Sequence, residues 1–128
     1  MSSITKCLFP VAGYGTRFLP VTKSIPKEML PILTKPLIQY GVEEAMSAGI
    51  TDISIITNND KKAIKDYFLA TSDLINDFKV NQKNSPIDKL NHIINCCNFN
   101  YALQDERLGL GHAILTGEPL IGNEPFGV

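Results

Sequence analysis

Residues 4–17 read ITKCLFPVAGYGTR, and this stretch decides the fold. Residues 4–11 predict a first strand, because the CLF run at 7–9 is continuously apolar, as in a parallel strand covered on both faces. The strand passes directly into AGYG at 12–15, where two glycines let the chain bend tightly. We therefore expect a buried parallel strand with a loop at its carboxyl end, where α/β proteins bind ligands.

Downstream of this loop the hydrophobic pattern alternates between helices and strands. The expected order is a helix at 36–49, a strand at 53–57, a helix at 58–69, mostly helical residues at 72–95, a strand at 99–103, a helix at 111–118 and the start of a strand at Val128. Asn58 or Asn59 is expected to cap the second of these helices. The alternation implies an α/β fold with a mainly parallel sheet and right-handed crossovers.

A proline-rich segment, 16–36, separates the first strand from the first helix. No long helix can cross its four prolines, which are Pro20, Pro26, Pro31 and Pro36. The segment also contains too many Leu, Ile, Met and Phe residues for a disordered linker, so we expect ordered, irregular structure over the top of the sheet. Loops of this length in compact domains usually serve function. With residues 104–111, this segment lies at the carboxyl edge of the predicted sheet.

The composition is that of an ordinary globular protein. A chain of 128 residues suits one domain, and 44% hydrophobic with 20% charged residues argues against disorder, collagen and coiled coil. The 12 basic and 13 acidic residues give a net charge of −1. A protein that holds nucleic acid by neutralising phosphates would carry a basic excess, so no nucleic-acid partner is expected. A small, local site is the expected place for any bound phosphate.

The cysteines and the N-terminal residues indicate the cellular compartment in which the protein is expected. Cys7, Cys96 and Cys97 are an odd number with two adjacent, which is a poor disulfide framework and indicates free thiols in a reducing cytosol. No stretch of the sequence reaches the roughly 18 apolar residues that span a membrane, and the first residues lack the long apolar run of a signal peptide. We expect a cytoplasmic protein without a membrane partner.

Three kinds of phosphate-binding loop compete for the glycines after the first strand. A Walker-type loop needs a Gly-Lys pair, which does not follow here. A dinucleotide fingerprint needs a small third residue and a regular helix, but this sequence places Phe18 at that position and Pro20 soon after it. A lone Gly-x-Gly is weak support for any of the three.

Residues 13–31, GYGTRFLPVTKSIPKEMLP, resemble the sugar nucleotidyltransferase family. The family pattern is Gly-x-Gly-Thr-Arg-x-x-Pro-x-Thr-Lys followed by Pro-Lys-Glu-Met-x-Pro. Lys-Glu-Met, here at 27–29, is typical of the bacterial UTP–glucose-1-phosphate uridylyltransferases within it. The resemblance implies a three-layer Rossmann-like fold. Residues 1–128 would be the N-terminal, nucleotide-binding part of a single domain truncated at its C-terminus.

The chemistry of this loop agrees with the resemblance. Gly13 and Gly15 let the backbone approach a triphosphate, and successive N–H groups form an anion-binding concavity. Arg17 offers a planar fork for phosphate oxygens and Lys27 a compact charge, so these two are the expected catalytic residues. The expected nucleotide-binding residues are Ala12, Gly13, Gly15, Thr16, Arg17, Lys27, Glu28, Gln104 and Gly109.

The resemblance also assigns roles in the second loop. Gln104 would recognise the pyrimidine base, with help from a backbone amide at Gly109, because a side-chain amide both donates and accepts. Glu28 would either face the base or order the two cations. Lys23 and His92 are expected at the surface, and His112 as a residue that packs the entry of a helix.

The implied reaction converts UTP and α-D-glucose 1-phosphate to UDP-glucose and diphosphate. Mg²⁺ would complete the charge balance, with no metal ligand within this chain and the ligands expected beyond Val128. On that basis the 128 residues alone would be inactive, and the full-length protein a homo-oligomer, dimer or tetramer. Open alternatives are a thymidylyl- or cytidylyltransferase, a dinucleotide-binding module, and a non-catalytic sugar-nucleotide-binding module.

Overall fold

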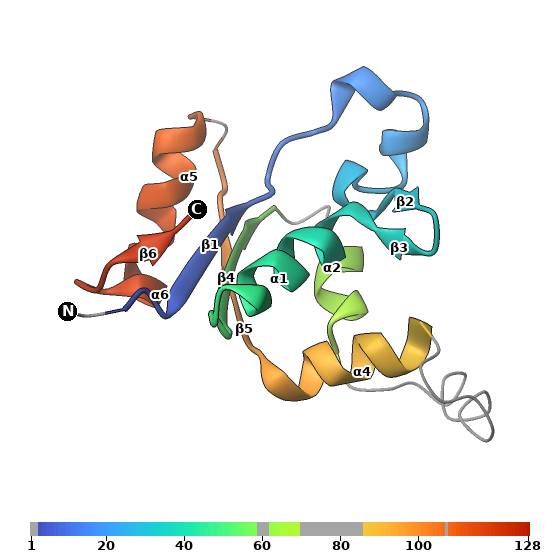
Figure 1. Ribbon diagram of the computed structural model, residues 1–128. Helices are drawn as coiled ribbons and strands as arrows, with labels where there is room; N and C mark the ends of the chain where they lie inside the picture. Colours follow the sequence, from blue (N-terminus) through green and yellow to red (C-terminus); the bar gives the residue numbers. More distant parts are fainter. Residues whose placement is uncertain (1–2, 59–61, 70–85, 107) are drawn as a thin grey trace.

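The computed structural model describes residues 3–58, 62–69, 86–106 and 108–128 (Figure 1). Its centre is a four-stranded sheet in the order β5-β4-β1-β6, and every neighbouring pair is parallel. The strands are β1 (Lys6–Pro10), β4 (Asp52–Thr57), β5 (Asn98–Leu103) and β6 (Phe126–Gly127). The chain builds outward from β1 to β4 and β5, then returns to the other side of β1 for β6. The order therefore reverses beside β1, which is the point where open α/β sheets bind ligands.

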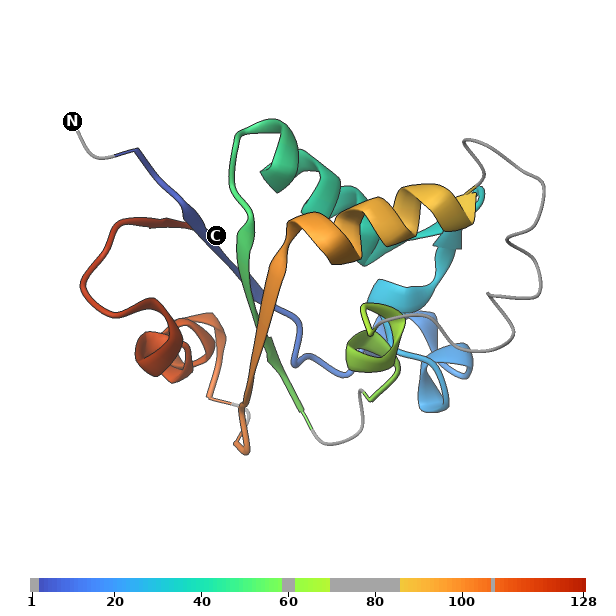
Figure 2. The same cartoon turned by 90° about the horizontal axis from the view of Figure 1, so that it is seen from below.

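Helices cover both faces of this sheet, as Figures 1 and 2 show. One face carries α1 (Leu37–Ser47), α2 (Lys62–Tyr67) and α4 (Pro86–Cys96), and the other carries α5 (Leu110–Thr116) and α6 (Glu118–Ile121). The result is the predicted three-layer α/β arrangement.

Alternation along the strands explains the two layers of core. On β4, the fully buried Ile53 and Ile55 face α1, α2 and α4, packing with Val42 and Ile64. Ile56 points to the opposite face, where it joins another cluster that also contains Leu8, Ala113 and Ile121. Because both faces of the central strands are buried, their sequences lack the apolar–polar alternation of a half-exposed strand.

The corner between α5 and α6 lies very close to the sheet at Gly117. A Cβ atom on this residue would lie 2.3 Å from Leu8 Cδ1 and 3.2 Å from Ile56 Cδ1. Both of those side chains are fully buried. Glycine therefore lets this helical corner approach β1 and β4.

The proline-rich segment contains no long helix, as predicted. It forms three one-turn 3-10 helices, η1 (Thr16–Phe18), η2 (Val21–Lys23) and η3 (Lys27–Met29). A small antiparallel pair follows, made of β2 (Pro31–Ile32) and β3 (Lys35–Pro36), which the sequence pattern did not predict. Figure 1 shows the segment beyond the carboxyl end of β1.

Most predicted elements are confirmed, with shifted ends. The strand at 4–11 is shorter in the structure, and the helix at 36–49 corresponds to α1. The helix predicted at 111–118 is divided, because the chain turns at Gly117 before α6 begins. Of the residues predicted to be mostly helical, 72–85 lie outside the described residues, and α4 begins at Pro86.

One predicted element end is wrong. The last strand does not start at Val128, because hydrogen bonding to β1 already pairs Lys6 with Phe126 and Cys7 with Gly127. Asn58 donates from its side chain to the glycine loop, and its expected role as a helix cap stays a prediction, since the residues between it and Lys62 lie outside the described residues. The alternative cap, Asn59, lies outside the described residues.

Candidate nucleotide-binding site

Two of the cavities at the carboxyl edge of the sheet meet at Gly13, which lines both of them. The first, the Gln104 cavity, has a volume of about 420 Å³, and its lining includes Ala12, Gly13, Gln104, Gly109 and Ala113. The second, the Arg17 cavity, has a volume of about 440 Å³, and its lining includes Gly13, Gly15, Thr16, Arg17 and Lys27. The structure thus brings the loops after β1 and β5 together, as the sequence predicts. A cavity of about 500 Å³ beside α1 and α4 contains none of the predicted site residues.

Gly15 fixes the shape of the Arg17 cavity. Its backbone is left-handed, with φ 63° and ψ 40°, a conformation that favours glycine. A Cβ atom here would lie 3.1 Å from both Lys27 Cβ and Thr22 Cγ2. The Thr22 hydroxyl donates to the Gly15 carbonyl over 2.7 Å. Gly15 therefore packs directly on the stem of a predicted catalytic lysine.

Gly13 differs from Gly15 in its surroundings. No atom lies within 4 Å of the position that a Cβ on Gly13 would occupy, so that position is open space. Gly13 also belongs to the lining of both cavities. The missing side chain keeps the backbone of this residue accessible to a ligand.

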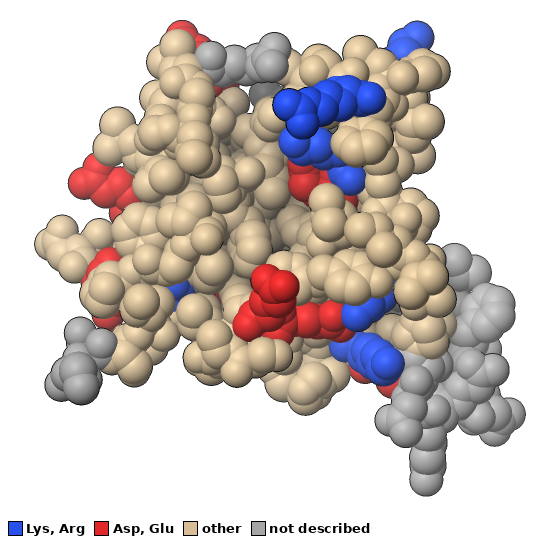
Figure 3. Space-filling view, turned by 45° about the horizontal axis from the view of Figure 1, so that its top comes forward, with Lys and Arg blue, Asp and Glu red and all other residues tan. Residues whose placement is uncertain are grey.

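Arg17 and Lys27 place two positive charges in the Arg17 cavity. Both side chains are exposed, on η1 and η3 respectively. The ion pairs seen among the described residues are Lys6–Glu124 and Lys35–Glu43, and neither neutralises these cations. In the space-filling view of Figure 3, Lys and Arg side chains gather beside a hollow, over the segment that follows β1. This local charge suits an anionic ligand although the chain as a whole is near neutral.

Two hydrogen bonds connect the start of the glycine loop to β4 and to the residue that follows it. The Val11 N–H donates to the Ile56 carbonyl over 2.8 Å, and Asn58 Nδ2 donates to the Ala12 carbonyl over 2.7 Å. These bonds fix the end of β1 just before the loop turns. The sequence predicts Asn58 only as a possible helix cap, and no local pattern indicates its contact with the glycine loop.

Gln104 extends the pairing of β4 and β5 and then reaches toward the second loop. Its N–H donates to the Thr57 carbonyl over 2.8 Å. Its side-chain Nε2 lies 3.3 Å from the Gly109 carbonyl oxygen and 2.9 Å from His112 Nδ1. Gly109 has a φ of +92°, which favours glycine, and its carbonyl also accepts from the Ala113 N–H over 3.1 Å. His112 thus contacts a predicted base-binding residue, which the sequence did not indicate.

Glu28 differs from the neighbouring Lys27 in being buried. It belongs to η3, is only 6% exposed, and lines neither of the two cavities. Its neighbours in sequence, Lys27 and Met29, lie in the Arg17 cavity and against the core respectively. The proposed contact of Glu28 with a base or a cation stays a prediction.

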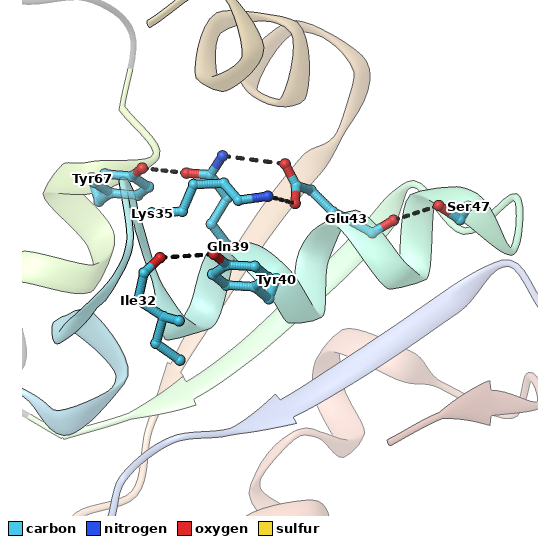
Figure 4. A network of polar contacts seen from close by, with 7 residues as sticks. All are labelled: Ile32, Lys35, Gln39, Tyr40, Glu43, Ser47 and Tyr67. Atoms are coloured by element: carbon cyan, nitrogen blue, oxygen red, sulfur yellow. Dashed lines mark hydrogen bonds and ion pairs between the residues drawn. The ribbon is translucent and has the colours of Figure 1, made fainter. Parts of the chain in front are cut away.

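A partly buried polar network links α1, α2 and β3, near the segment that carries Arg17 and Lys27 (Figure 4). The Tyr67 hydroxyl on α2 donates to Gln39 Oε1 on α1, and Gln39 Nε2 donates to Glu43 Oε1 over 3.3 Å. Glu43 also forms an ion pair of 2.6 Å with Lys35 on β3. Burial raises the pKa of Tyr67 to about 12, and the nearby Glu43 charge adds to this effect. The network therefore ties together the elements that follow η3.

The described residues contain neither a metal-binding cluster nor a membrane-spanning helix. No group of three or more His, Cys, Asp or Glu side chains in the described residues is placed to hold a metal ion. Among the described helices, none combines the length and the apolar character that crossing a membrane requires.

The fold and site define a class of protein, and comparison with known proteins agrees. Residues 10–128 match the family model described as Nucleotidyl transferase, so the chain belongs to that family. A UTP–glucose-1-phosphate uridylyltransferase of Pseudomonas aeruginosa is 54% identical over 125 residues, covering 98% of this chain and 45% of that protein. The enzyme of the same name from Staphylococcus haemolyticus is 50% identical over 128 residues, covering 44% of its length. The chain thus spans about half the length of the curated relatives it matches.

Solved structures give the same result for the fold. An apo UDP-glucose pyrophosphorylase superposes with a TM-score of 0.91 at 55% identity, covering 97% of this chain and 45% of that one. A UTP-bound enzyme of this type from Acinetobacter baumannii has a TM-score of 0.87 at 38% identity, covering 97% of this chain and 44% of its own. These similarities confirm the predicted Rossmann-like fold and family.

Proposed function

We propose that this chain is the UTP-binding part of a UTP–glucose-1-phosphate uridylyltransferase. The observation that carries the proposal is the pair of cavities that meet at Gly13. One presents the Gln104 amide, which suits the polar edge of a base, and the other presents Arg17 and Lys27, which suit phosphates. A nucleoside triphosphate has its base and its phosphates at opposite ends, as this site requires. The relatives with this name, and the UTP-bound neighbour, support uracil as the base.

In the proposed reaction an oxygen of the glucose 1-phosphate monoester attacks the α-phosphorus of UTP in line. A new P–O bond forms, the bond to the β-phosphate oxygen breaks, and diphosphate leaves. The attacking oxygen is already ionised at neutral pH, so neither a protein nucleophile nor a strong base is required. Catalysis then depends on positioning and on neutralising charge.

Arg17 and Lys27 have separate roles in this proposal. Arg17 contacts the β- and γ-phosphates with its planar fork and stabilises the departing diphosphate. Lys27 bridges the α-phosphate and the incoming sugar phosphate. The missing side chain at Gly15 leaves room for the Lys27 stem, whose Cβ would lie 3.1 Å from a Cβ on Gly15.

Mg²⁺ and oligomer formation stay predictions from the resemblance, and a cytoplasmic location stays a prediction from the cysteines and the N-terminal residues. A divalent cation would neutralise part of the triphosphate charge. The described residues contain no cluster that would hold it, so no residue here is assigned as a ligand. The proposed charge neutralisation within this chain therefore rests on Arg17 and Lys27.

Titration of the ¹⁵N-labelled chain with UTP tests the proposal. We expect UTP to shift the amide signals of Gly13, Gly15, Gln104 and Gly109 together, because the ligand must contact both cavities. Uridine should shift the signals of Gly13, Gln104 and Gly109 but not that of Gly15, which lines only the Arg17 cavity of the two. ATP should bind far more weakly because a purine does not present a uracil edge. If UTP leaves these four signals in place, the assignment of the site is wrong.

A further inference from the structure

Two acceptors hold the side-chain amide of Gln104 in one orientation. If the proposed function is right, this orientation determines which base the site selects. Its Nε2 atom contacts the Gly109 carbonyl oxygen at 3.3 Å and His112 Nδ1 at 2.9 Å. A carbonyl oxygen can only accept, so the atom facing Gly109 must be the NH₂ group of Gln104 rather than its oxygen. One amide hydrogen is therefore directed to Gly109 and the other to His112.

The second contact also assigns the state of His112. Nδ1 accepts a hydrogen bond from the amide, so it carries no proton, and the imidazole is the neutral tautomer with its hydrogen on Nε2. The residue is itself held in place, because the Thr116 hydroxyl donates to its carbonyl over 2.8 Å. His112 therefore presents a fixed acceptor to Gln104.

With both hydrogens used, Gln104 offers a ligand only an acceptor. Its Oε1 accepts no hydrogen bond from any of the described residues. Uracil and thymine have an N3–H donor at the centre of their pairing edge, which complements this oxygen. Cytosine has an unprotonated N3 acceptor at the same place, so its lone pair would face that of Oε1.

We propose that His112 is a positioning residue that makes the site select a pyrimidine with an N3–H over cytosine. The Gly109 contact alone is long for a hydrogen bond, so it orients the amide weakly. Without the acceptor at His112, the amide can turn over and present its NH₂ group to the ligand. Gln104 could then pair with the N3–H donor of uracil or with the N3 acceptor of cytosine, so the preference of the site for uracil over cytosine would fall.

The test compares two variants of the full 128-residue chain against three nucleotides. His112→Phe keeps a planar ring but removes the nitrogen acceptor, whereas His112→Asn keeps an acceptor oxygen near the place of Nδ1. Affinities for UTP, dTTP and CTP are measured by titration of the ¹⁵N-labelled proteins. We expect the preference for UTP over CTP to fall about tenfold in His112→Phe, the effect of one lost hydrogen bond. His112→Asn should restore most of it.

The ratio of UTP to dTTP affinity is the internal control, because uracil and thymine have the same pairing edge. It should stay constant in both variants, whereas a merely structural role of His112 would weaken all three nucleotides alike. An unchanged preference for UTP over CTP in His112→Phe would overturn the inference and leave the proposed function intact. Failure of the wild-type chain to bind any of the three nucleotides would defeat the proposed function and the inference with it.

A second measurement covers the case in which His112→Phe does not fold. In the wild-type chain, both side-chain amide hydrogens of Gln104 should exchange slowly with solvent, because each is hydrogen-bonded. In His112→Asn they should stay protected. Fast exchange of both hydrogens in the wild-type chain would show that the amide is not held and would contradict the inference.

Discussion

Among single residues, Gly15 shapes the proposed site through both its backbone conformation and its missing side chain. Its left-handed conformation costs a residue with a Cβ atom roughly 1–2 kcal/mol. The same substitution would press a methyl group against Lys27 and Thr22 at 3.1 Å. The turn and the position of the lysine therefore depend on one missing side chain.

Gly15→Ala should lower both stability and nucleotide affinity. We expect about 1 kcal/mol of lost stability in urea unfolding, together with weaker UTP binding because the Lys27 stem is displaced. Gly13→Ala is the matched control. It should leave stability nearly unchanged, since its Cβ meets nothing within 4 Å, yet still weaken UTP binding by covering backbone that lines both cavities. Equal stability loss in the two variants would contradict this account of Gly15.

Removing either cation should separate triphosphate binding from base binding. Arg17→Ala and Lys27→Ala should each weaken UTP about tenfold to a hundredfold, the effect of losing a charge-assisted hydrogen bond to phosphate. Uridine, which has no phosphate, should bind all variants equally. Lys89→Ala, an exposed change on α4, is the control and should leave UTP binding unaltered. Weaker uridine binding in Arg17→Ala would show that the effect is structural.

Contacts between residues far apart in the chain limited what the sequence could predict about the site. Gly13, Gly15, Arg17 and Lys27 follow one another in a fixed register, so a local pattern was enough to propose them. Asn58 contacts Ala12 across 46 positions, and no local signal specifies that pairing. Side-chain orientation at Gln104 and His112 likewise depends on the loop that folds between them.

At the scale of elements, burial determined which boundaries were predictable. Residues 7–9 of β1 are continuously apolar, and the isoleucines at 53, 55 and 56 of β4 are interrupted only by the buried Ser54, because both faces of these strands are covered. The edge strand β6 pairs through only two residues, so its start had no comparable signal. The pair β2 and β3 consists of two residues on each side and was also missed.

The corner between α5 and α6 gives a prediction about stability. Gly117→Ala should destabilise the protein by about 1–3 kcal/mol, because the new methyl group overlaps the fully buried Leu8 side chain. Urea unfolding measures the change. Gly111→Ala, within α5 and with nothing within 4 Å of its Cβ position, should be neutral or slightly stabilising. A stable Gly117→Ala variant would mean that the corner can move away from the sheet.

At the level of the whole molecule, the partly buried Tyr67 and Tyr101 lie on the same side of the sheet. Tyr67 and Tyr101 both pack against the core formed with α1, α2 and α4. Burial raises the pKa of each to about 12, from an ordinary value of 10. The hydroxyl of Tyr67 also donates to Gln39 in the polar network. Their ionisation therefore couples alkaline pH to the stability of the entire fold.

The raised pKa values of Tyr67 and Tyr101 determine whether stability rises or falls with pH. Above pH 10 the unfolded chain loses the two phenolic protons, whereas the folded chain keeps them until about pH 12. The unfolded state then binds fewer protons, so the free energy of unfolding falls as pH rises through this window. Below pH 10 the contribution of both tyrosines is fully present. We expect the urea midpoint to decline between these limits.

Single substitutions identify the tyrosines as the cause of this decline. Tyr67→Phe and Tyr101→Phe should each make the decline shallower, because one ionisable group is removed. Tyr67→Phe also loses the hydrogen bond to Gln39, which lowers stability even at neutral pH, so the slope rather than the level is the measurement. Tyr14→Phe, at a side chain that is 46% exposed, should keep the wild-type slope. If all three variants decline in parallel with the wild type, alkaline unfolding has another origin, and the buried phenols do not control it.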